Sequence, residues 1–173
     1  MIKPFIATLL IVLAPAAVHA AQPQELEWDD LVPESWQPQT LFEEFSGVTD
    51  IEDEDPLAEK LMQRIREVWD SAPLVESLNG KRVRLPGYGV PLDGDASEVR
   101  TFLLVPYFGA CIHTPPPPRN QIVLVTTAGK GVPVDDAFGA LWVTGILKVD
   151  PAQTEFGLAG YTLLADQFEV IEY

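Results

Sequence analysis

The spacing of apolar residues changes once along this chain, from the period of a helix to the period of a strand. Between positions 56 and 71, apolar residues recur every three to four positions, and Pro56 stands where a first-turn proline is favoured. We therefore predict one helix over 56–71, which ends before Pro73. From position 82 onward, apolar residues recur at every second position, a period typical of strands with one buried face.

Five strand-like segments make up this second part of the chain. They are predicted at 82–92, 99–106, 121–127, 140–149 and 161–171. Gly87 and Gly89 interrupt the first segment, Gly145 interrupts the fourth, and the fifth is broken near Asp166. Such breaks are typical of strands that bend around a small barrel. The pattern therefore predicts a mainly β fold, a small OB-fold-like five-stranded barrel with an N-terminal arm and one helix.

The first twenty residues have the pattern of a secretory leader. Lys3 precedes an apolar stretch over 5–14, and the small residues Val18 and Ala20 stand just before Ala21. The apolar stretch is too short to span a membrane. We therefore predict a signal peptide over 1–20 and an exported mature chain with no membrane span after cleavage.

The remaining sequence divides into an arm and one domain. Residues 21–55 are polar, acidic and rich in proline, yet they include Trp28 and Trp36. Flexible tails seldom carry two tryptophans, so we expect this acidic arm to pack on the domain. The domain itself is predicted over 56–173, as the helix followed by the barrel.

The charge of the chain restricts its partners. Its formal net charge is −15, which repels phosphate backbones and disfavours nucleic-acid binding. The same charge favours cations, basic peptides or a positively charged partner surface, or it serves only to keep the protein soluble. The densest acidic run, over 50–55, lacks the spacing and the glycine of an EF-hand loop, so we interpret it as an acidic helix start.

Candidate chemistry lies in one segment of the chain. Cys111, the only cysteine, and His113 stand two positions apart, between an apolar run and four prolines over 115–118. Side chains at i and i+2 of an extended segment leave the same face, and a thiolate and an imidazole are ligands that zinc prefers. Cys111 and His113 are therefore candidate metal ligands, with zinc as the possible cofactor.

Two ligands do not complete a zinc site. A further ligand would have to be a water, a residue of a partner chain or a carboxylate, for example Asp93, Asp95 or Glu98 between the first two strands. Cys111 can instead be a buried structural thiol, with His113 bonded to its own loop.

A thiol enzyme is a further alternative, because an imidazole can activate a nearby thiolate. However, the sequence offers no identifiable orienting Asn or Asp and no G-x-S-x-G, C-x-x-C, phosphate-loop, dinucleotide-binding or H-E-x-x-H motif. The sequence therefore favours a non-enzymatic protein, with no catalytic residue assigned.

The proline run also has two interpretations. It can be a polyproline II segment that a partner recognises, or a stiff brace that sets the direction of Cys111 and His113, and we favour the brace. Arg119, which follows the run, is expected to pair with a carboxylate on the helix or the arm.

Four phrases of the sequence resemble a known family. They are GYGVPL (87–92), FLLVPYFGACIHTPPPPRNQIV (102–123), LWVTGIL (141–147) and GLAGYTL (157–163). In this order they are similar to a family of exported Gram-negative proteins known only as a domain of unknown function, with the signature FLLVPYFGACIHxPPPPxNQ. The resemblance covers about 28–170.

The resemblance implies a periplasmic location and a metal-linked role. Genes of that family commonly lie beside a MacB-like or lipoprotein-exporter-like ABC transporter and a histidine-rich periplasmic protein, in zinc-responsive groups. We therefore expect a periplasmic accessory protein of a metal-linked, zinc-associated ABC transport or homeostasis system. Its expected partner is the periplasmic side of that transporter or a metal-binding protein. The alternative is an interaction module for an envelope ABC transporter or lipoprotein that binds no metal.

Overall fold

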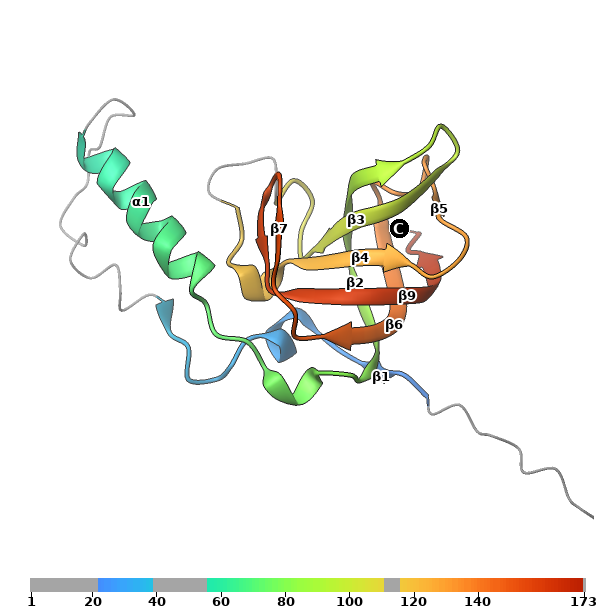
Figure 1. The fold of residues 1–173 in the computed structure, drawn as a ribbon, viewed down its shortest axis with the longest axis horizontal. Helices are drawn as coiled ribbons and strands as arrows, with labels where there is room; N and C mark the ends of the chain where they lie inside the picture. Colours follow the sequence, from blue (N-terminus) through green and yellow to red (C-terminus); the bar gives the residue numbers. More distant parts are fainter. Residues whose placement is uncertain (1–21, 39–55, 111–115, 173) are drawn as a thin grey trace, which may run out of the picture.

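The computed structural model of this chain describes residues 22–38, 56–110 and 116–172. The predicted leader, the acidic run over 50–55 and the candidate ligands Cys111 and His113 lie outside the described residues. Among the described helices, none is long and apolar enough to cross a membrane. In Figure 1, the helix α1 (Pro56–Asp70) extends to one side of a strand-rich body.

Five strands close into a ring, which confirms the predicted OB-fold-like barrel with one helix. These strands are β2 (Arg82–Gly94), β3 (Glu98–Val105), β4 (Val123–Thr127), β6 (Ala140–Lys148) and β9 (Tyr161–Val170). Around the ring, β2 is followed by β6, β9, β4 and β3, and β3 pairs again with β2. All five pairings are antiparallel except that of β4 with β9, which is parallel. The C-terminal strand β9 therefore lies between two earlier strands.

Strand β2 is shared between the two halves of the barrel. Its first half pairs with β6 and its second half with β3, and Tyr88 at the switch pairs with a residue of each. The predicted glycine positions match this bend. A Cβ atom on Gly87 would lie 2.8 Å from Leu104 Cγ, and one on Gly89 would lie 2.0 Å from the carbonyl oxygen of Ala137. Only glycine allows the chain to pass this closely.

Strand β9 is also irregular where the sequence predicts a break. Thr144 of β6 pairs with Gln167 but the next residue, Gly145, pairs with Ala165, so Asp166 is an extra residue in β9. This is a β-bulge, which bends the strand and opens space beside it. A Cβ atom on Gly145 would lie 2.2 Å from the carbonyl oxygen of Leu164, which accounts for the glycine opposite the bulge.

The core fills the interior of the ring. It includes alternate residues of every barrel strand, among them Val83, Leu85, Phe102, Leu104, Val123, Val125, Leu141, Val143, Leu147 and Leu163. Each is buried because side chains at every second position of a strand point to the same side.

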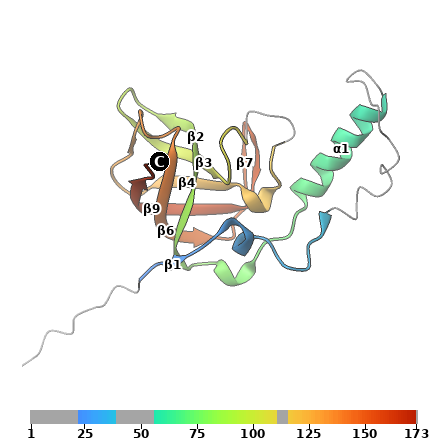
Figure 2. The ribbon, with the colours of Figure 1, turned by 180° about the vertical axis from the view of Figure 1, so that it is seen from behind.

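The described part of the arm, 22–38, lies across one end of the barrel in both views (Figures 1 and 2). It forms β1 (Gln24–Glu25), parallel to β2, and a short 3₁₀ helix (Trp28–Leu31). Leu26 and Leu31 are fully buried in the core. The Tyr161 hydroxyl donates a hydrogen bond to the Leu31 carbonyl and accepts one from the Val75 amide, both at 2.7 Å. The arm thus closes this end of the barrel, and burial raises the pKa of Tyr161.

Several short elements lie between the helix and the barrel strands or between successive barrel strands. They are the 3₁₀ helices Glu76–Leu78 and Arg119–Gln121, and the strands β5 (Val132–Pro133), β7 (Ala152–Thr154) and β8 (Gly157–Ala159). The helix α1 matches the predicted span to within one residue, and Val68 is its one residue buried among those described.

Candidate functional site

The outer side of the barrel has two unlike faces. The face made by the first half of β2 with β6 and β9 contains two ion-paired arginines. The Arg84 guanidinium lies 3.9 Å above the ring of Trp142 and pairs at 3.0 Å with both Glu25 and Glu169. We call this face, defined by Arg82, Arg84, Trp142, Asp166 and Glu169, the ion-paired face.

Arg82 forms the second pair of the ion-paired face. Its guanidinium makes a two-pronged contact with the Asp166 carboxylate, in which Arg82 Nη2 lies 2.9 Å from Asp166 Oδ1. Hydrogen bonding from Arg82 lowers the pKa of Asp166, and Asp166 raises the pKa of Arg82. Both arginines of this face are therefore neutralised by carboxylates of the same chain.

A groove lies farther along β2 from the ion-paired face, where this strand switches from β6 to β3. Its volume is about 250 Å³, and its lining consists of Trp28, Pro86, Gly87, Tyr88, Pro106, Ala140 and Ile171. The Trp28 indole N–H donates a 2.8 Å hydrogen bond to the Pro86 carbonyl, which fixes the ring. We call this the aromatic groove. Its walls offer flat rings and prolines.

Exposed aromatic side chains flank the aromatic groove. The ring of Phe108 contacts Tyr88 edge to face, with centroids 6.1 Å apart, yet 73% of Phe108 is exposed. Its neighbour Tyr107 is 53% exposed. Phe138 is 59% exposed and precedes Gly139, whose carbonyl accepts the Gly89 amide at 3.1 Å. Exposed aromatic rings near a hollow are typical of interaction sites.

The sequence predictions placed the chemistry elsewhere, in the loop that contains Cys111 and His113. These two residues lie outside the described residues, so their roles stay predictions. The flanks of that loop are described. Ala110 is buried on one side, in a cluster outside the ring that includes Leu103 and Ile122.

On the other side of the loop, two side chains hold the chain to the segment after α1. Arg119 Nε donates to the Ala72 carbonyl at 2.7 Å, and Asn120 Nδ2 donates to the Pro73 carbonyl at 3.2 Å. The partner of Arg119 among the described residues is thus a backbone carbonyl, whereas the sequence predicted a carboxylate. The Ala72 carbonyl is the partner because the chain after the helix passes directly beside Arg119.

The carboxylates considered as further zinc ligands lie at the far end of β3. Asp95 accepts hydrogen bonds from the Ser97 hydroxyl and amide and from the Glu98 amide at 2.7 to 3.0 Å, which lower its pKa to about 2. Glu98 and Val105 stand at opposite ends of β3, roughly 23 Å apart at 3.3 Å per residue. This separation disfavours them as partners of the loop after Val105. In the described ranges no cluster of three metal-ligating side chains is present.

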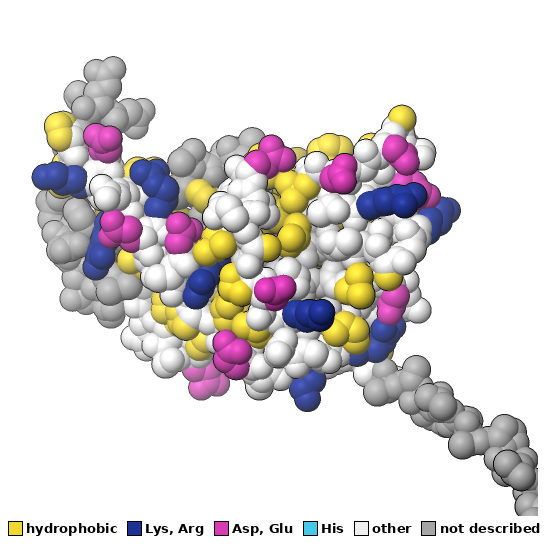
Figure 3. All heavy atoms as spheres, viewed as in Figure 1, with side chains coloured by type: hydrophobic (Ala, Val, Ile, Leu, Met, Phe, Trp, Pro, Cys, Tyr) yellow, Lys and Arg dark blue, Asp and Glu magenta, His cyan; other side chains and the backbone are white. Residues whose placement is uncertain are grey.

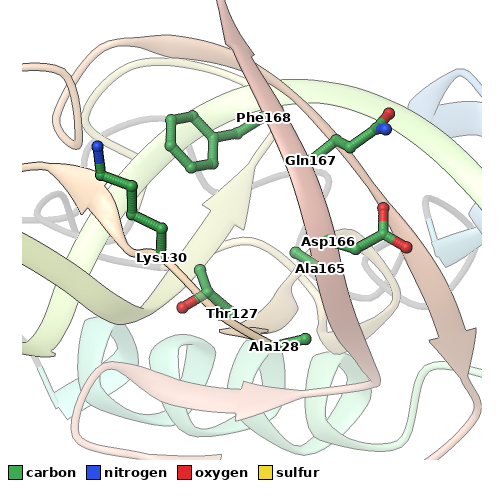
Figure 4. A pocket seen from close by; sticks show the side chains of 8 residues that line it. Thr127, Ala128, Lys130, Ala165, Asp166, Gln167 and Phe168 are labelled. Carbon is green, nitrogen blue, oxygen red and sulfur yellow. The ribbon is translucent and has the colours of Figure 1, made fainter.

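A second hollow, of about 300 Å³, opens beside the bulge of β9 and is drawn in Figure 4. Lys130 and Phe168 lie on one side of the strand, whereas Asp166 and Gln167 lie on the other. The Thr127 hydroxyl is buried and has no hydrogen-bond partner among the described atoms. Because the amine and the carboxylate do not converge, this hollow does not form a catalytic pair.

Hydrophobic side chains also gather in the middle of the face that carries β3, β4 and β9 (Figure 3). Leu164 of β9 is 49% exposed. Leu164 does not line the aromatic groove, and it therefore serves below as a control position.

Comparison with known proteins gives a family but no activity. A family model described as "Protein of unknown function (DUF3299)" matches residues 28–170. The crystal structure of a DUF3299 family protein from Pseudomonas aeruginosa PAO1 is 40% identical, with a TM-score of 0.67. That match covers 88% of this chain and 98% of the other. A search of curated proteins finds no match.

Proposed function

Because this chain belongs to the DUF3299 family of proteins of unknown function, its role must follow from its own residues, and we propose that it is a non-enzymatic binding protein. The observation that carries this proposal is the aromatic groove, with Phe108, Tyr107 and Phe138 exposed around it. Exposed apolar rings beside a hollow are typical of surfaces that another protein covers.

The described residues also favour binding over catalysis. The ion pairs of Arg82 with Asp166 and of Arg84 with Glu25 and Glu169 neutralise both arginines within the chain, which leaves neither charge for a substrate.

We propose further that the protein acts in the periplasm as an accessory of a metal-linked ABC transport or homeostasis system. The leader pattern over 1–20 supports the location. The family resemblance supports the transport system, because it implies a MacB-like transporter and a zinc-responsive gene group. A protein that binds a transporter component needs an exposed apolar surface, and the aromatic groove supplies one.

Site-specific photocrosslinking in a native host tests this function. A benzoylphenylalanine at position 108 should form a crosslink to a periplasmic transport component, and one at position 164 should not. Cell fractionation of the same strain should place the chain in the periplasm, beginning near Ala21. Equal crosslinking from both positions, a partner outside the envelope or a cytoplasmic location would contradict the proposal.

Zinc binding at Cys111 and His113 is a second candidate function. The observation that favours it is that the flanks of their loop are held in place, by burial of Ala110 and by the hydrogen bonds of Arg119 and Asn120. Held flanks reduce the entropy lost when a loop orders around a metal.

Thiol alkylation separates this candidate from a structural cysteine. If Cys111 binds zinc, its thiol should react readily in the metal-free protein and zinc should protect it. Dialysis against zinc, with Cys111→Ser and His113→Ala as variants, should show reduced binding in both. A thiol that reacts only after unfolding, together with equal zinc binding by all three proteins, would leave the metal-free interaction module as the function.

A further inference from the structure

Three of the five segments that form the aromatic groove are acidic, and none of the five is basic. The stretches 22–38, 86–92, 106–110, 131–141 and 170–172 contain no lysine and no arginine. Their acidic residues are Glu25, Glu27, Asp29, Asp30, Glu34, Asp135, Asp136 and Glu172. Glu27 and Asp29 flank the lining residue Trp28, and Glu172 follows the lining residue Ile171. All three of these carboxylates are exposed, and none forms an ion pair with lysine or arginine in the described chain.

The lining determines which atoms an occupant can present. The Trp28 indole N–H is already bonded to the Pro86 carbonyl, so the tryptophan offers its ring surface and no spare donor. Tyr88 and Phe108 offer further ring surface at one end. Aromatic faces attract the side chains of arginine and lysine, whose apolar stems cover the ring while the charge reaches the rim.

We propose that the aromatic groove binds an extended, basic segment of a partner protein. In this complex the arginine or lysine stems of the segment lie on Tyr88 and Phe108, and their charges pair with Asp29 and Glu172. The inference rests on the proposed function, because it names the chemistry of the partner that the groove binds.

Charge complementarity selects this occupant over others. A nucleic acid or an anionic lipid surface would be repelled by a chain of net charge −15. A second copy of the chain would bring the same acidic rim against itself, and like charges across an interface disfavour association. A basic segment is instead attracted by the negative charge of the chain and also gains contacts with the aromatic rings.

Selection from a random dodecapeptide display library tests the proposal. The bait is the purified chain without its predicted leader, and a second selection uses the Phe108→Ser variant, whose substituted side chain is mostly exposed and leaves the fold intact. We expect peptides enriched in arginine or lysine from the first selection and their loss from the second. The strongest peptide is then labelled and its Kd measured by fluorescence anisotropy.

The variants divide the binding energy between rings and charges. Phe108→Ser should raise the Kd of the peptide about 10-fold, and the double variant Asp29→Asn with Glu172→Gln should raise it about 5-fold. Both effects are limited because cation–π contacts and ion pairs at the rim are each of modest strength. The charge variant should also reduce the dependence of Kd on salt. Leu164→Ser, the matched control on another face, should leave Kd unchanged. Thermal unfolding followed by circular dichroism verifies that each variant is folded.

The outcomes distinguish this inference from the proposed function. Enrichment of neutral or acidic peptides, no enrichment at all, or equal loss of binding in Leu164→Ser would overturn the basic-segment inference. The proposed function would still stand if the crosslink at position 108 reached a transport component. Loss of that crosslink together with a basic peptide that binds would instead overturn the transport role and leave the groove chemistry intact.

Discussion

The ion-paired face and the aromatic groove both contain aromatic rings and carboxylates, but they differ in whether the chain itself supplies a cation to pair with them. On the ion-paired face, the ring of Trp142 is covered by Arg84, and Arg84 is neutralised by Glu25 and Glu169. In the aromatic groove the rings and the carboxylates are present, but no described residue of its segments supplies a cation. On the ion-paired face, one arginine covers a ring and pairs with carboxylates. We propose that an arginine of a partner makes the same contacts in the aromatic groove.

The comparison also explains why the ion-paired face is a poor binding site. A partner there would have to displace Arg84 from Trp142 and from two carboxylates before it gained any contact. A partner at the aromatic groove displaces only water from exposed rings such as Phe108, which favours binding. The ion-paired face is therefore structural because its charges are paired within the chain, whereas the aromatic groove leaves its rings and carboxylates open to the proposed partner.

The largest expected effect is on the stability of the barrel, which carries both the ion-paired face and the aromatic groove. Leu31→Ala removes a fully buried side chain from the end of the barrel, so the free energy of unfolding should fall by about 2–5 kcal/mol. Because Trp28 belongs to the same 3₁₀ helix, peptide binding at the groove should fall as well. Urea denaturation and anisotropy measure the two effects. A stability loss confined to less than about 1 kcal/mol would show that the arm is not part of the core.

The next effect breaks the ion-paired face alone. Arg84→Gln removes one cation–π contact and two ion pairs, and since the pairs are partly exposed, the expected loss of stability is about 1 kcal/mol. Tryptophan fluorescence should change, because Trp142 loses its cover. Binding of a basic peptide to the groove should stay within about twofold of wild type. A larger change in binding would mean that the two faces are coupled.

The smallest expected effect is on the pKa values of two carboxyl groups, Asp166 of the ion-paired face and Asp95 outside it. Asp166 is held ionised mainly by the Arg82 hydrogen bond, whereas Asp95 is held by the uncharged donors of Ser97 and Glu98. Both pKa values are lowered, so each group stabilises the folded state above its unfolded pKa near 4, and this contribution is lost as the pH falls through the folded pKa. For Asp95 that window extends down to about pH 2.

Carboxyl NMR titrations at low and high salt measure these two groups. High salt should raise the pKa of Asp166 toward its ordinary value, because salt screens its ion pair, and should change that of Asp95 less. Ser97→Ala should raise the pKa of Asp95, because it removes the strongest donor. Equal responses of both groups to salt would contradict the assigned causes.

The strands of the barrel were predictable from sequence because their signals are local. Alternation such as Phe102 and Leu104 inside with Leu103 outside follows from burial of one strand face. Gly87, Gly89 and Gly145 indicated the bends because no larger residue fits where backbones approach. These features need no knowledge of distant contacts, and the five predicted strands match those of the structure.

The closing role of the arm could not be predicted in the same way. Leu26 and Leu31 lie in a two-residue strand and a short 3₁₀ helix, which have no period to recognise. Their burial depends on Tyr161, more than a hundred positions away. Short β5, β7 and β8 were missed for the same reason.

The aromatic groove was not predicted as a candidate site, and the reason is physical. Sequence reasoning favours reactive side chains, and it therefore selected Cys111 and His113 rather than unreactive rings. Tyr107 and Phe108 carried a usable signal: two adjacent aromatic residues directly after the proline that follows a buried strand. Large rings at a position where the chain leaves the core are often exposed. The groove itself was not predictable, since its lining comes from five segments far apart in sequence.

The position of β9 between β6 and β4 has a consequence for how the chain becomes a folded protein. A polypeptide that emerges N-terminus first, from a ribosome or through a membrane pore, has no closed barrel until β9 has emerged. Until then β6 and β4 each present an unpaired edge, which other extended chains can join. Closure also joins segments far apart in sequence, which makes folding slow. A helper that shields these edges during this interval would therefore raise the yield of soluble protein.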